Sequence, residues 1–194
     1  MFTIFILFFC FISTLAGANL PGECPQMKIQ ENLDYTKFAQ GIWYEVERYP
    51  NAAEEGRECG SAEYTRKGSV VSVKYDFVKD HQLIVERGTV KLANKNNNLG
   101  VVTQTLPLGA YGAFADYNLN ILAIEYDKYF IGYYCKYDES SKSHREYAWV
   151  FSRTKALPTY EKAQVTKFIQ KSTVLDEDLF QWPKFTAEAC RIEP

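Results

Sequence analysis

Apolar and polar residues alternate along most of this chain with a period of two. In residues 70–78 the odd positions, from Val71 to Phe77, are apolar or aromatic, and the residues at 72, 74 and 76 between them are polar. Residues 111–123 repeat the pattern, again with aromatic or aliphatic residues at the odd positions. A period of two places every second side chain on the same face of a strand. Both segments are therefore predicted to be strands with one buried face.

Further strand-like runs of similar length follow one another between short polar breaks. Several breaks are rich in Gly, Asn, Asp or Ser, which are residues that form tight turns. Short strands at regular spacing with turns between them are typical of an antiparallel sandwich or barrel. In all, eight strands are predicted, at residues 42–49, 58–65, 70–78, 83–92, 99–106, 111–123, 129–137 and 144–151.

One segment near the C-terminal end has a helical pattern instead. Pro158 and Thr159 precede the run YEKAQVTKFIQK, in which Val165, Phe168 and Ile169 form an apolar stripe. Such a stripe indicates a helix with one buried side, and the preceding Pro-Thr is typical of a helix start. This helix is predicted to pack against the sheet from outside.

Eight consecutive antiparallel strands can close into an up-and-down barrel, which removes the unpaired edges of an open sheet. A barrel of this size has an interior that is large enough for one small ligand. Ala113 and Ala115 lie between aromatic residues on the predicted inner face, and small residues there leave space. We therefore predict an all-β fold, an eight-stranded antiparallel up-and-down β-barrel with one C-terminal α-helix outside it. The alternative is two tightly packed sheets without a cavity.

The first 18 residues contain no charged side chain and end in Ala16-Gly17-Ala18. Small residues at positions 16 and 18, with one residue between them, are typical of a signal-peptide cleavage site. We predict a signal peptide over residues 1–18, a single domain over residues 19–194, and secretion into the extracellular space. The alternative is a retained N-terminal anchor. No later apolar run reaches the roughly 18 residues of a membrane helix, so no transmembrane segment is expected after cleavage.

The formal net charge is −2, and the basic residues are spread singly along the chain. A nucleic-acid partner is not expected, because such proteins need a basic face to neutralise phosphates. An even number of cysteines remains after cleavage, which allows three disulfide pairings that spacing does not distinguish. They are Cys24, Cys59, Cys135 and Cys190. No pair of them is closely spaced and the chain has only two histidines, so no metal site is predicted.

Three short motifs resemble those of the lipocalin family. Gly41-Ile42-Trp43, at the start of the first predicted strand, matches the family's G-x-W signature. Residues 124–129, IEYDKY, are a degenerate form of its T-D-Y-x-x-Y turn, and Arg153 matches its final arginine. The resemblance implies that Gly41 and Trp43 belong to the closed end of the barrel and that Arg153 packs over the indole ring.

Longer segments are similar to insect bilin-binding lipocalins of the insecticyanin type, with apolipoprotein D as a broader relative. These segments are residues 24–25, 38–51, 59–65, 131–139, 148–157 and 185–190. The resemblance implies two disulfide bonds, Cys24–Cys135 and Cys59–Cys190. It also implies that the barrel holds a bilin such as biliverdin non-covalently and requires no other cofactor.

Strand parity and this resemblance together select the candidate ligand-binding residues. They are Asn51, Ala53, Tyr75, Phe77, Glu86, Ala113, Ala115, Tyr117, Tyr134, Lys136, Arg145 and Tyr147. Lys136 and Arg145 would form charge-assisted bonds with ligand carboxylates, whereas an inward Glu86 would disfavour an anionic ligand unless it is protonated or accepts from a pyrrole N–H. A bulge at Gly88 would instead turn Glu86 outward.

We predict a secreted carrier of a small hydrophobic ligand, with a biliverdin-type pigment first and a retinoid, fatty acid or sterol as the alternative. No catalytic residue is predicted, because the mature cysteines are expected to be paired and no thiolate nucleophile is left. Haem carriage through an axial histidine is a weaker alternative, since His81 and His144 both lie near predicted turns. No surface is marked for a protein partner, and a homo-oligomer is left open.

Overall fold

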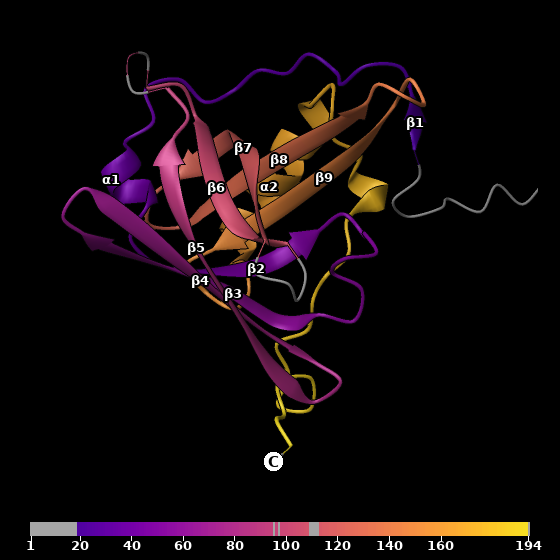
Figure 1. Cartoon of the computed structure of the whole chain (residues 1–194). Coiled ribbons are helices and arrows are strands. Elements are labelled where there is room, and N and C mark those ends of the chain that lie inside the picture. The colour runs from indigo at the N-terminus through magenta and orange to yellow at the C-terminus, as the bar shows by residue number, and fades with distance from the viewer. Residues whose placement is uncertain (1–18, 95, 97, 109–112, 194) are drawn as a thin grey trace, which may run out of the picture.

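The structure is a computed structural model that describes residues 19–94, 96, 98–108 and 113–193 (Figure 1). Within these residues nine strands form one antiparallel sheet in the order β1-β9-β2-β3-β4-β5-β6-β7-β8. Because β9 also pairs with β8, the eight long strands close into a barrel. The predicted fold is confirmed, and the predicted signal peptide lies outside the described residues.

All eight predicted strands are found, and their ends differ from the prediction by at most two residues, with residues 111 and 112 outside the described chain. They are β2 (Gly41–Arg48), β3 (Glu58–Lys67), β4 (Val70–Lys79), β5 (Gln82–Leu92), β6 (Val101–Leu108), β7 (Ala113–Glu125), β8 (Tyr129–Asp138) and β9 (Ser143–Ser152). The short β1 (Leu20–Pro21), which the pattern does not predict, pairs with the start of β9.

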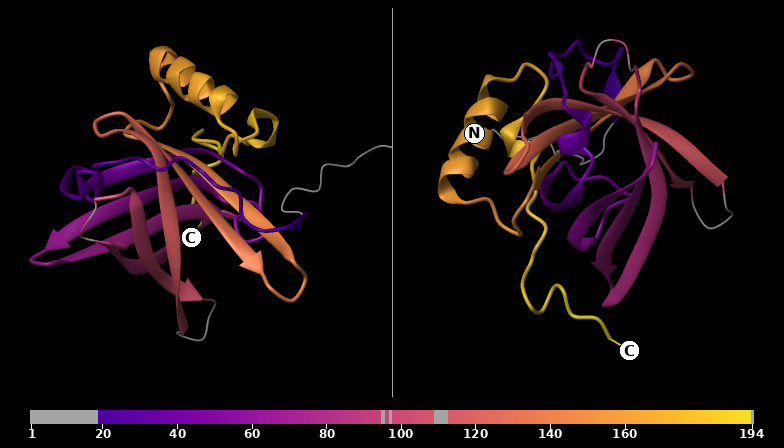
Figure 2. Two further views of the ribbon diagram at one scale, coloured as in Figure 1. Left: turned by 90° about the horizontal axis from the view of Figure 1, so that it is seen from above. Right: turned by 90° about the vertical axis from the view of Figure 1, so that its left-hand side faces the viewer.

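The predicted helix is α2 (Thr159–Lys171), which lies against the outer surface of the barrel (Figure 2). Its Val165 and Ile169 are buried in a core that includes Val46 of β2 and Val150 of β9. A 3-10 helix, η2 (Glu177–Leu179), follows it. The single turn α1 (Tyr35–Phe38) was not predicted; the Asp34 side chain accepts hydrogen bonds from two of its backbone N–H groups.

A second core fills one end of the barrel interior. Trp43 and Phe38 are fully buried there, and the indole Nε1 donates to the Phe38 carbonyl at 3.0 Å. The rings of Trp43 and Phe130 meet edge to face with centroids 4.9 Å apart, and Phe130 stacks on Phe151 at the same distance. Aromatic side chains therefore seal this end of the barrel.

Arg153 covers this plug from outside the barrel. Its guanidinium lies 3.4 Å from the centroid of the Trp43 ring and donates to the carbonyls of residues 37, 40, 42 and 126. Gly41 has a φ of +65°, and a Cβ there would lie 3.5 Å from Arg153 Nη1. A glycine therefore fits at this position both for its backbone conformation and for the close guanidinium.

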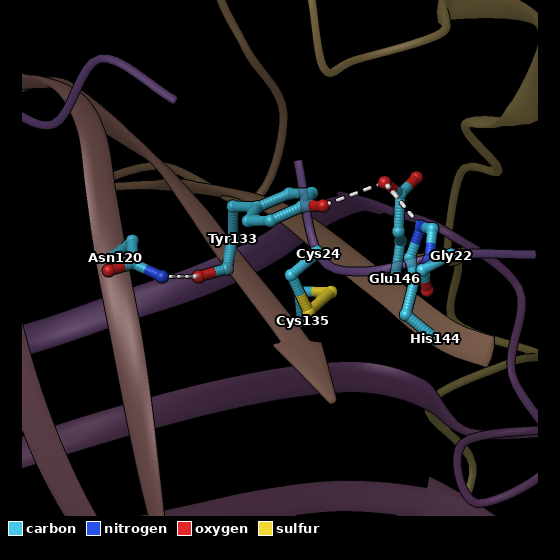
Figure 3. The surroundings of a disulfide bond; sticks show 7 residues. All are labelled: Gly22, Cys24, Asn120, Tyr133, Cys135, His144 and Glu146. Atoms are coloured by element: carbon cyan, nitrogen blue, oxygen red, sulfur yellow. Dashed lines mark hydrogen bonds and ion pairs between the residues drawn. A yellow bond between two sulfur atoms is a disulfide. The ribbon is translucent and has the colours of Figure 1, made fainter. Parts of the chain in front are cut away.

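Two disulfide bonds, with the pairing that the resemblance implies, tie the terminal segments to the barrel. Cys24 bonds to Cys135 of β8, and Cys59 of β3 bonds to Cys190. Figure 3 shows the first bond, with the N-terminal segment beside β9. There His144 Nδ1 lies 2.9 Å from the Gly22 carbonyl oxygen. The segment before Cys24 is therefore fixed beside one end of β9.

Candidate ligand-binding site

A cavity of about 490 Å³ occupies the barrel between the aromatic plug and the end that carries the β8–β9 hairpin. Residues from all eight long strands and from the β2–β3 loop line it. Its volume lies within the range of small-molecule sites, about 300–1,000 Å³. The alternative of two tightly packed sheets is therefore wrong.

Nine of the twelve predicted ligand-binding residues line this cavity. They are Asn51, Ala53, Tyr75, Phe77, Glu86, Tyr117, Tyr134, Lys136 and Tyr147. The strand residues among them share the inward parity that the alternation indicated. Their contact with a ligand stays a prediction.

The other three predicted residues, Ala113, Ala115 and Arg145, are not part of the cavity wall. Both alanines lie at the N-terminal end of β7, where Ala113 is exposed and Ala115 is half-buried. Arg145 pairs with Lys136 across β8 and β9, but its Nε donates to Asn19 Oδ1 at 2.7 Å in a separate surface hollow. Parity identifies the inner face of a strand, but it does not show where along the strand the cavity ends.

One wall of the cavity is a row of four aromatic rings across β7, β8 and β9. Tyr117 meets Tyr134 edge to face at 5.7 Å, Tyr134 stacks on Tyr147 at 5.6 Å, and Tyr147 stacks on Trp149 at 6.1 Å. Burial raises the pKa of Tyr134, so its hydroxyl stays neutral at physiological pH. The row presents flat apolar surface with few polar groups.

Deeper in the cavity, Tyr75 and Gln104 form a neutral polar pair. The Tyr75 hydroxyl donates to Gln104 Oε1 at 2.8 Å. Burial raises the pKa of Tyr75 well above its ordinary value. The hydroxyl is therefore a permanent donor that is already used within the protein.

Arg48 organises the loop between β2 and β3. Its guanidinium contacts Glu45 Oε1 at 2.5 Å and donates to the carbonyls of Glu54 at 3.0 Å and Arg57 at 2.8 Å. A guanidinium offers five N–H donors in a fixed fork, and here three contacts hold a strand residue and both ends of a loop turn. Arg48 therefore holds the loop over this side of the cavity.

The Glu54 carboxylate joins the same loop to β9. It accepts from Trp149 Nε1 at 3.1 and 3.3 Å and from Asn51 Nδ2 at 2.5 Å. Asn51, a predicted ligand-binding residue, thus lines the cavity while its amide is bonded to a neighbouring side chain. The apolar body of Trp149 remains on the cavity wall.

Glu86 faces the cavity, as its parity indicates, and the bulge proposed at Gly88 is wrong. The β4–β5 register runs without a shift from Val71 to Lys79. Instead, a Cβ at Gly88 would lie 2.1 Å from the Thr105 carbonyl oxygen, so glycine allows β6 to approach closely.

The inward carboxylate of Glu86 is paired rather than free. Arg57 Nη2 lies 3.2 Å from Glu86 Oε1, and the same guanidinium lies 3.9 Å from the centroid of the Phe77 ring. Sequence reasoning treated Glu86 alone and did not include Arg57. The charge that would have disfavoured an anionic ligand is therefore offset by a neighbouring cation.

Arg48, Glu54, Arg57 and Glu86 form a charged network along the cavity, and the carboxyl group of Glu45 lies at its inner end. Burial and, after it, the Glu54 charge raise the pKa of Glu45 to about 7, although the ion pair with Arg48 acts in the opposite direction. Near neutral pH this side chain therefore exists in both protonation states.

Several lining residues were missed by sequence reasoning. They include Glu45, Arg48, Glu54, Arg57, Gln104, Leu106, Leu119, Trp149 and Phe151. Leu119, Trp149 and Phe151 share the parity of predicted neighbours on β7 and β9, so the alternation could have found them. Glu45 shares the parity of Trp43 and could also have been found, but Arg48 could not, because a register shift between Glu45 and Glu47 places residues of opposite parity on the same face.

The histidines lie outside the cavity wall. His81 occupies the β4–β5 turn, but His144 is buried within β9 and is not a turn residue, and its Nε2 lies 3.5 Å from Glu146 Oε1 (Figure 3). Among the described residues no group of His, Cys, Asp and Glu side chains could hold a metal ion. None of the helices in the described part of the chain is long and apolar enough to cross a membrane.

Comparison with known proteins gives one consistent family. Residues 40–184 match the Lipocalin / cytosolic fatty-acid binding protein family. The chain is 33% identical over 180 residues to the bilin-binding protein of Pieris brassicae, with 91% of this chain and 93% of that protein covered. It is 28% identical over 184 residues to apolipoprotein D of Mus musculus, covering 86% and 93% respectively.

A solved structure shares the fold closely. The structure of insecticyanin from the tobacco hornworm Manduca sexta superposes with a TM-score of 0.84 at 28% sequence identity. The match covers 91% of this chain and 93% of that one.

Proposed function

This chain belongs to the lipocalin family, and from that premise we propose that it is a carrier of a small hydrophobic ligand. The ligand is held non-covalently in the barrel, and a biliverdin-type bilin is the first candidate. The observation that carries the proposal is the cavity of about 490 Å³ with its row of four aromatic rings.

The bilin is favoured by the shape and chemistry of the wall. A bilin is a flat conjugated chain of four pyrrole-type rings, and stacked or edge-to-face aromatic side chains suit such a surface. Lys136 at the rim carries a cation that would bind a propionate. The names of the relatives in Pieris brassicae and Manduca sexta, a bilin-binding protein and an insecticyanin, add support.

A second candidate is the same barrel with another apolar ligand, such as a retinoid, a fatty acid or a sterol. The side chains of Leu106, Leu119 and Phe151 also line the cavity, and aliphatic and aromatic surface of this kind accepts any apolar molecule of suitable size. The relatedness to apolipoprotein D favours keeping this candidate.

Carriage rather than catalysis is proposed. Every cysteine in the described part of the chain is in a disulfide bond, so none of these residues offers a thiolate nucleophile. Neither histidine lines the cavity, which also weighs against haem held through an axial histidine.

We propose further that residues 1–18 are a signal peptide and that residues 19–194 form one secreted domain. Two disulfide bonds support this proposal, because such bonds persist in oxidising compartments and are rare in the cytosol.

The test is to isolate the protein from its source and to record its visible spectrum and the mass of any co-purifying molecule. A bilin is expected to give bands in the red and near-ultraviolet, and added biliverdin is expected to quench Trp149 fluorescence. A colourless protein that takes up no biliverdin contradicts the pigment proposal. Uptake of retinol or a fatty acid by such a preparation would support the second candidate.

A further inference from the structure

Glu45 lies in the cavity wall just above the aromatic plug, two residues after Trp43 on β2. Its side chain is only 13% exposed. Oε1 is occupied by Arg48. Oε2 has no hydrogen-bond partner among the described residues, and it is not fully buried. This oxygen therefore remains accessible from the cavity.

Gly60, on the neighbouring β3, keeps the space beside this carboxyl group open. A Cβ at Gly60 would lie 3.4 Å from Glu45 Cβ and 3.7 Å from Glu45 Oε2. Both residues line the cavity. A ligand atom can therefore approach Oε2 from the side that the glycine leaves free.

The cations at this depth are already engaged. Arg48 contacts Glu45 and two carbonyl oxygens. Arg57 donates from Nε to the Ala53 carbonyl and from Nη2 to Glu86. Both guanidinium groups are therefore tied to protein groups, while Glu45 Oε2 offers a ligand an unused hydrogen-bond acceptor beside them.

Lys136 provides the opposite chemistry at the rim. It lines the cavity and has no ion pair within the described part of the chain. The β9 partners of Glu45 and Lys136 are Phe151 and Arg145, six residues apart. At about 3.3 Å per residue this is about 20 Å of strand, so the two groups are too far apart to contact the same part of a ligand.

We propose that Glu45 is a specificity-determining residue, which accepts a hydrogen bond from an N–H group at the buried end of the ligand while ligand carboxylates stay near Lys136. The inference rests on the proposed carrier function, and it extends to any apolar ligand that carries an N–H or amine group. A site built around a polar group discriminates strongly against analogues that leave that group unpaired.

Burial first, and then the charges that face Glu45, determine how this recognition depends on pH. These charges are Arg48 on its own strand and Glu54 and Arg57 on the loop. The β3 and β9 residues beside it, Gly60 and Phe151, are uncharged. Since the pKa of Glu45 is about 7, its negative charge, and with it the affinity for a cationic amine, increases between pH 6 and pH 8.

The experiment is isothermal titration calorimetry of the full mature protein with dodecylamine and with dodecanoic acid. Glu45→Gln is expected to weaken dodecylamine binding at least about tenfold and to change dodecanoic acid binding less than twofold. Glu47→Gln is the matched control. Glu47 is also a buried carboxyl with a pKa raised to about 7, but it lies outside the cavity, so neither affinity is expected to change.

The pH profile of the parent provides a second measurement that does not depend on the folding of a variant. Dodecylamine affinity is expected to rise by up to about tenfold from pH 6 to pH 8, as one carboxyl ionises. A flat profile, or unchanged amine binding by a folded Glu45→Gln variant, would overturn the inference.

The two proposals fail in different ways. If dodecylamine behaves as expected but biliverdin does not bind, the pigment proposal fails and the role of Glu45 stands. If the parent binds biliverdin with the same affinity and spectrum as the Glu45→Gln variant and the amine is unaffected, the carrier function stands and the role of Glu45 fails. If the parent binds none of the three probes, both are overturned.

Discussion

Arg153 makes one contact that the family motifs implied, with the Trp43 ring, and several hydrogen bonds that they did not imply. The motifs imply that the guanidinium packs over the indole, and it lies 3.4 Å from the ring centroid. The hydrogen bonds from Arg153 to four backbone carbonyls add a second function, because they join α1, β2 and the β7–β8 turn. The arginine is therefore both a cover for the ring and a junction between segments.

Truncation of the indole should be strongly destabilising. Trp43→Ala is expected to lower the free energy of unfolding by about 3–5 kcal/mol, because it removes a fully buried large side chain and leaves a cavity. Urea unfolding at constant pH measures the change. Trp182→Ala is the control, since that ring is 50% exposed, and it should cost less than about 1 kcal/mol. An unchanged midpoint for Trp43→Ala would contradict the role of the plug.

Glu45 and Glu47 predict an unusual dependence of stability on pH. Burial is the main cause that raises the pKa of each from the ordinary value of 4.5 to about 7. Between these two pH values the folded state binds more protons than the unfolded state, so stability falls as pH rises. The stabilisation is complete below about pH 4.5 and is lost above about pH 7, with a slope of up to about 1.4 kcal/mol per pH unit for each carboxyl.

Urea unfolding of the parent and of the Glu45→Gln/Glu47→Gln double variant between pH 5 and pH 8 measures this dependence. The double variant should lack the part of the slope that these two carboxyls cause. Parallel curves for parent and variant would show that neither group titrates in this range.

Strand β2 shows how one irregularity changes what an element presents to the cavity. Trp43 and Glu45 follow the period of two, but the register shift before Glu47 turns Glu47 toward α2 and Arg48 toward the cavity. A bulge adds a residue on one strand and reverses the parity that follows it. The ion pair between Glu45 and Arg48 depends on this reversal.

The aromatic row across β7, β8 and β9 predicts the effect of removing one ring. Tyr134→Ala is expected to weaken biliverdin binding by about 1–2 kcal/mol, since Tyr134 contacts the rings on both sides of it. Quenching of tryptophan fluorescence in a biliverdin titration measures the change. Tyr160→Ala, which removes a ring that is 65% exposed on α2, should leave the affinity unchanged. Equal affinities for both variants would exclude the row from the binding site.

The two disulfide bonds act on the molecule as a whole. They link residues 111 and 131 positions apart in the sequence and fix the N-terminal and C-terminal segments against β8 and β3. Chain entropy makes long closures of this kind stabilising by about 2–5 kcal/mol each, although native-state strain can reduce the gain. The barrel itself is closed by backbone pairing and does not need them for closure.

Removing one bond should therefore lower stability without opening the barrel. The Cys59→Ser/Cys190→Ser double variant is expected to unfold at a lower temperature and to keep the biliverdin affinity of the parent, because neither cysteine lines the cavity. Thermal unfolding under non-reducing conditions and a ligand titration measure the two properties. The corresponding Cys24/Cys135 variant serves as the comparison. A loss of binding together with intact secondary structure would show that the C-terminal segment shapes the site.

The pattern of apolar and polar residues along the chain was sufficient to predict the eight strands, the inward faces of the regular ones and the helix α2. These features depend on which side of an element is apolar, and that is a local property of the sequence. Tyr75, Tyr117 and Tyr147 were found for this reason, and the family motifs added the roles of Trp43 and Arg153. Asp34 and α1 were missed because a single helical turn is too short to show a period.

The charged network of the cavity was decided by the tertiary structure alone. Arg57 pairs with Glu86 and Glu54 with Trp149 across 29 and 95 residues, and such partners are set by barrel closure and by the course of a loop. The depth of the cavity, which excludes Ala113, Ala115 and Arg145, depends on where side chains from several strands meet. A pattern along one strand shows neither the charged partners nor the depth of the cavity, because both depend on distances between segments that only folding brings together.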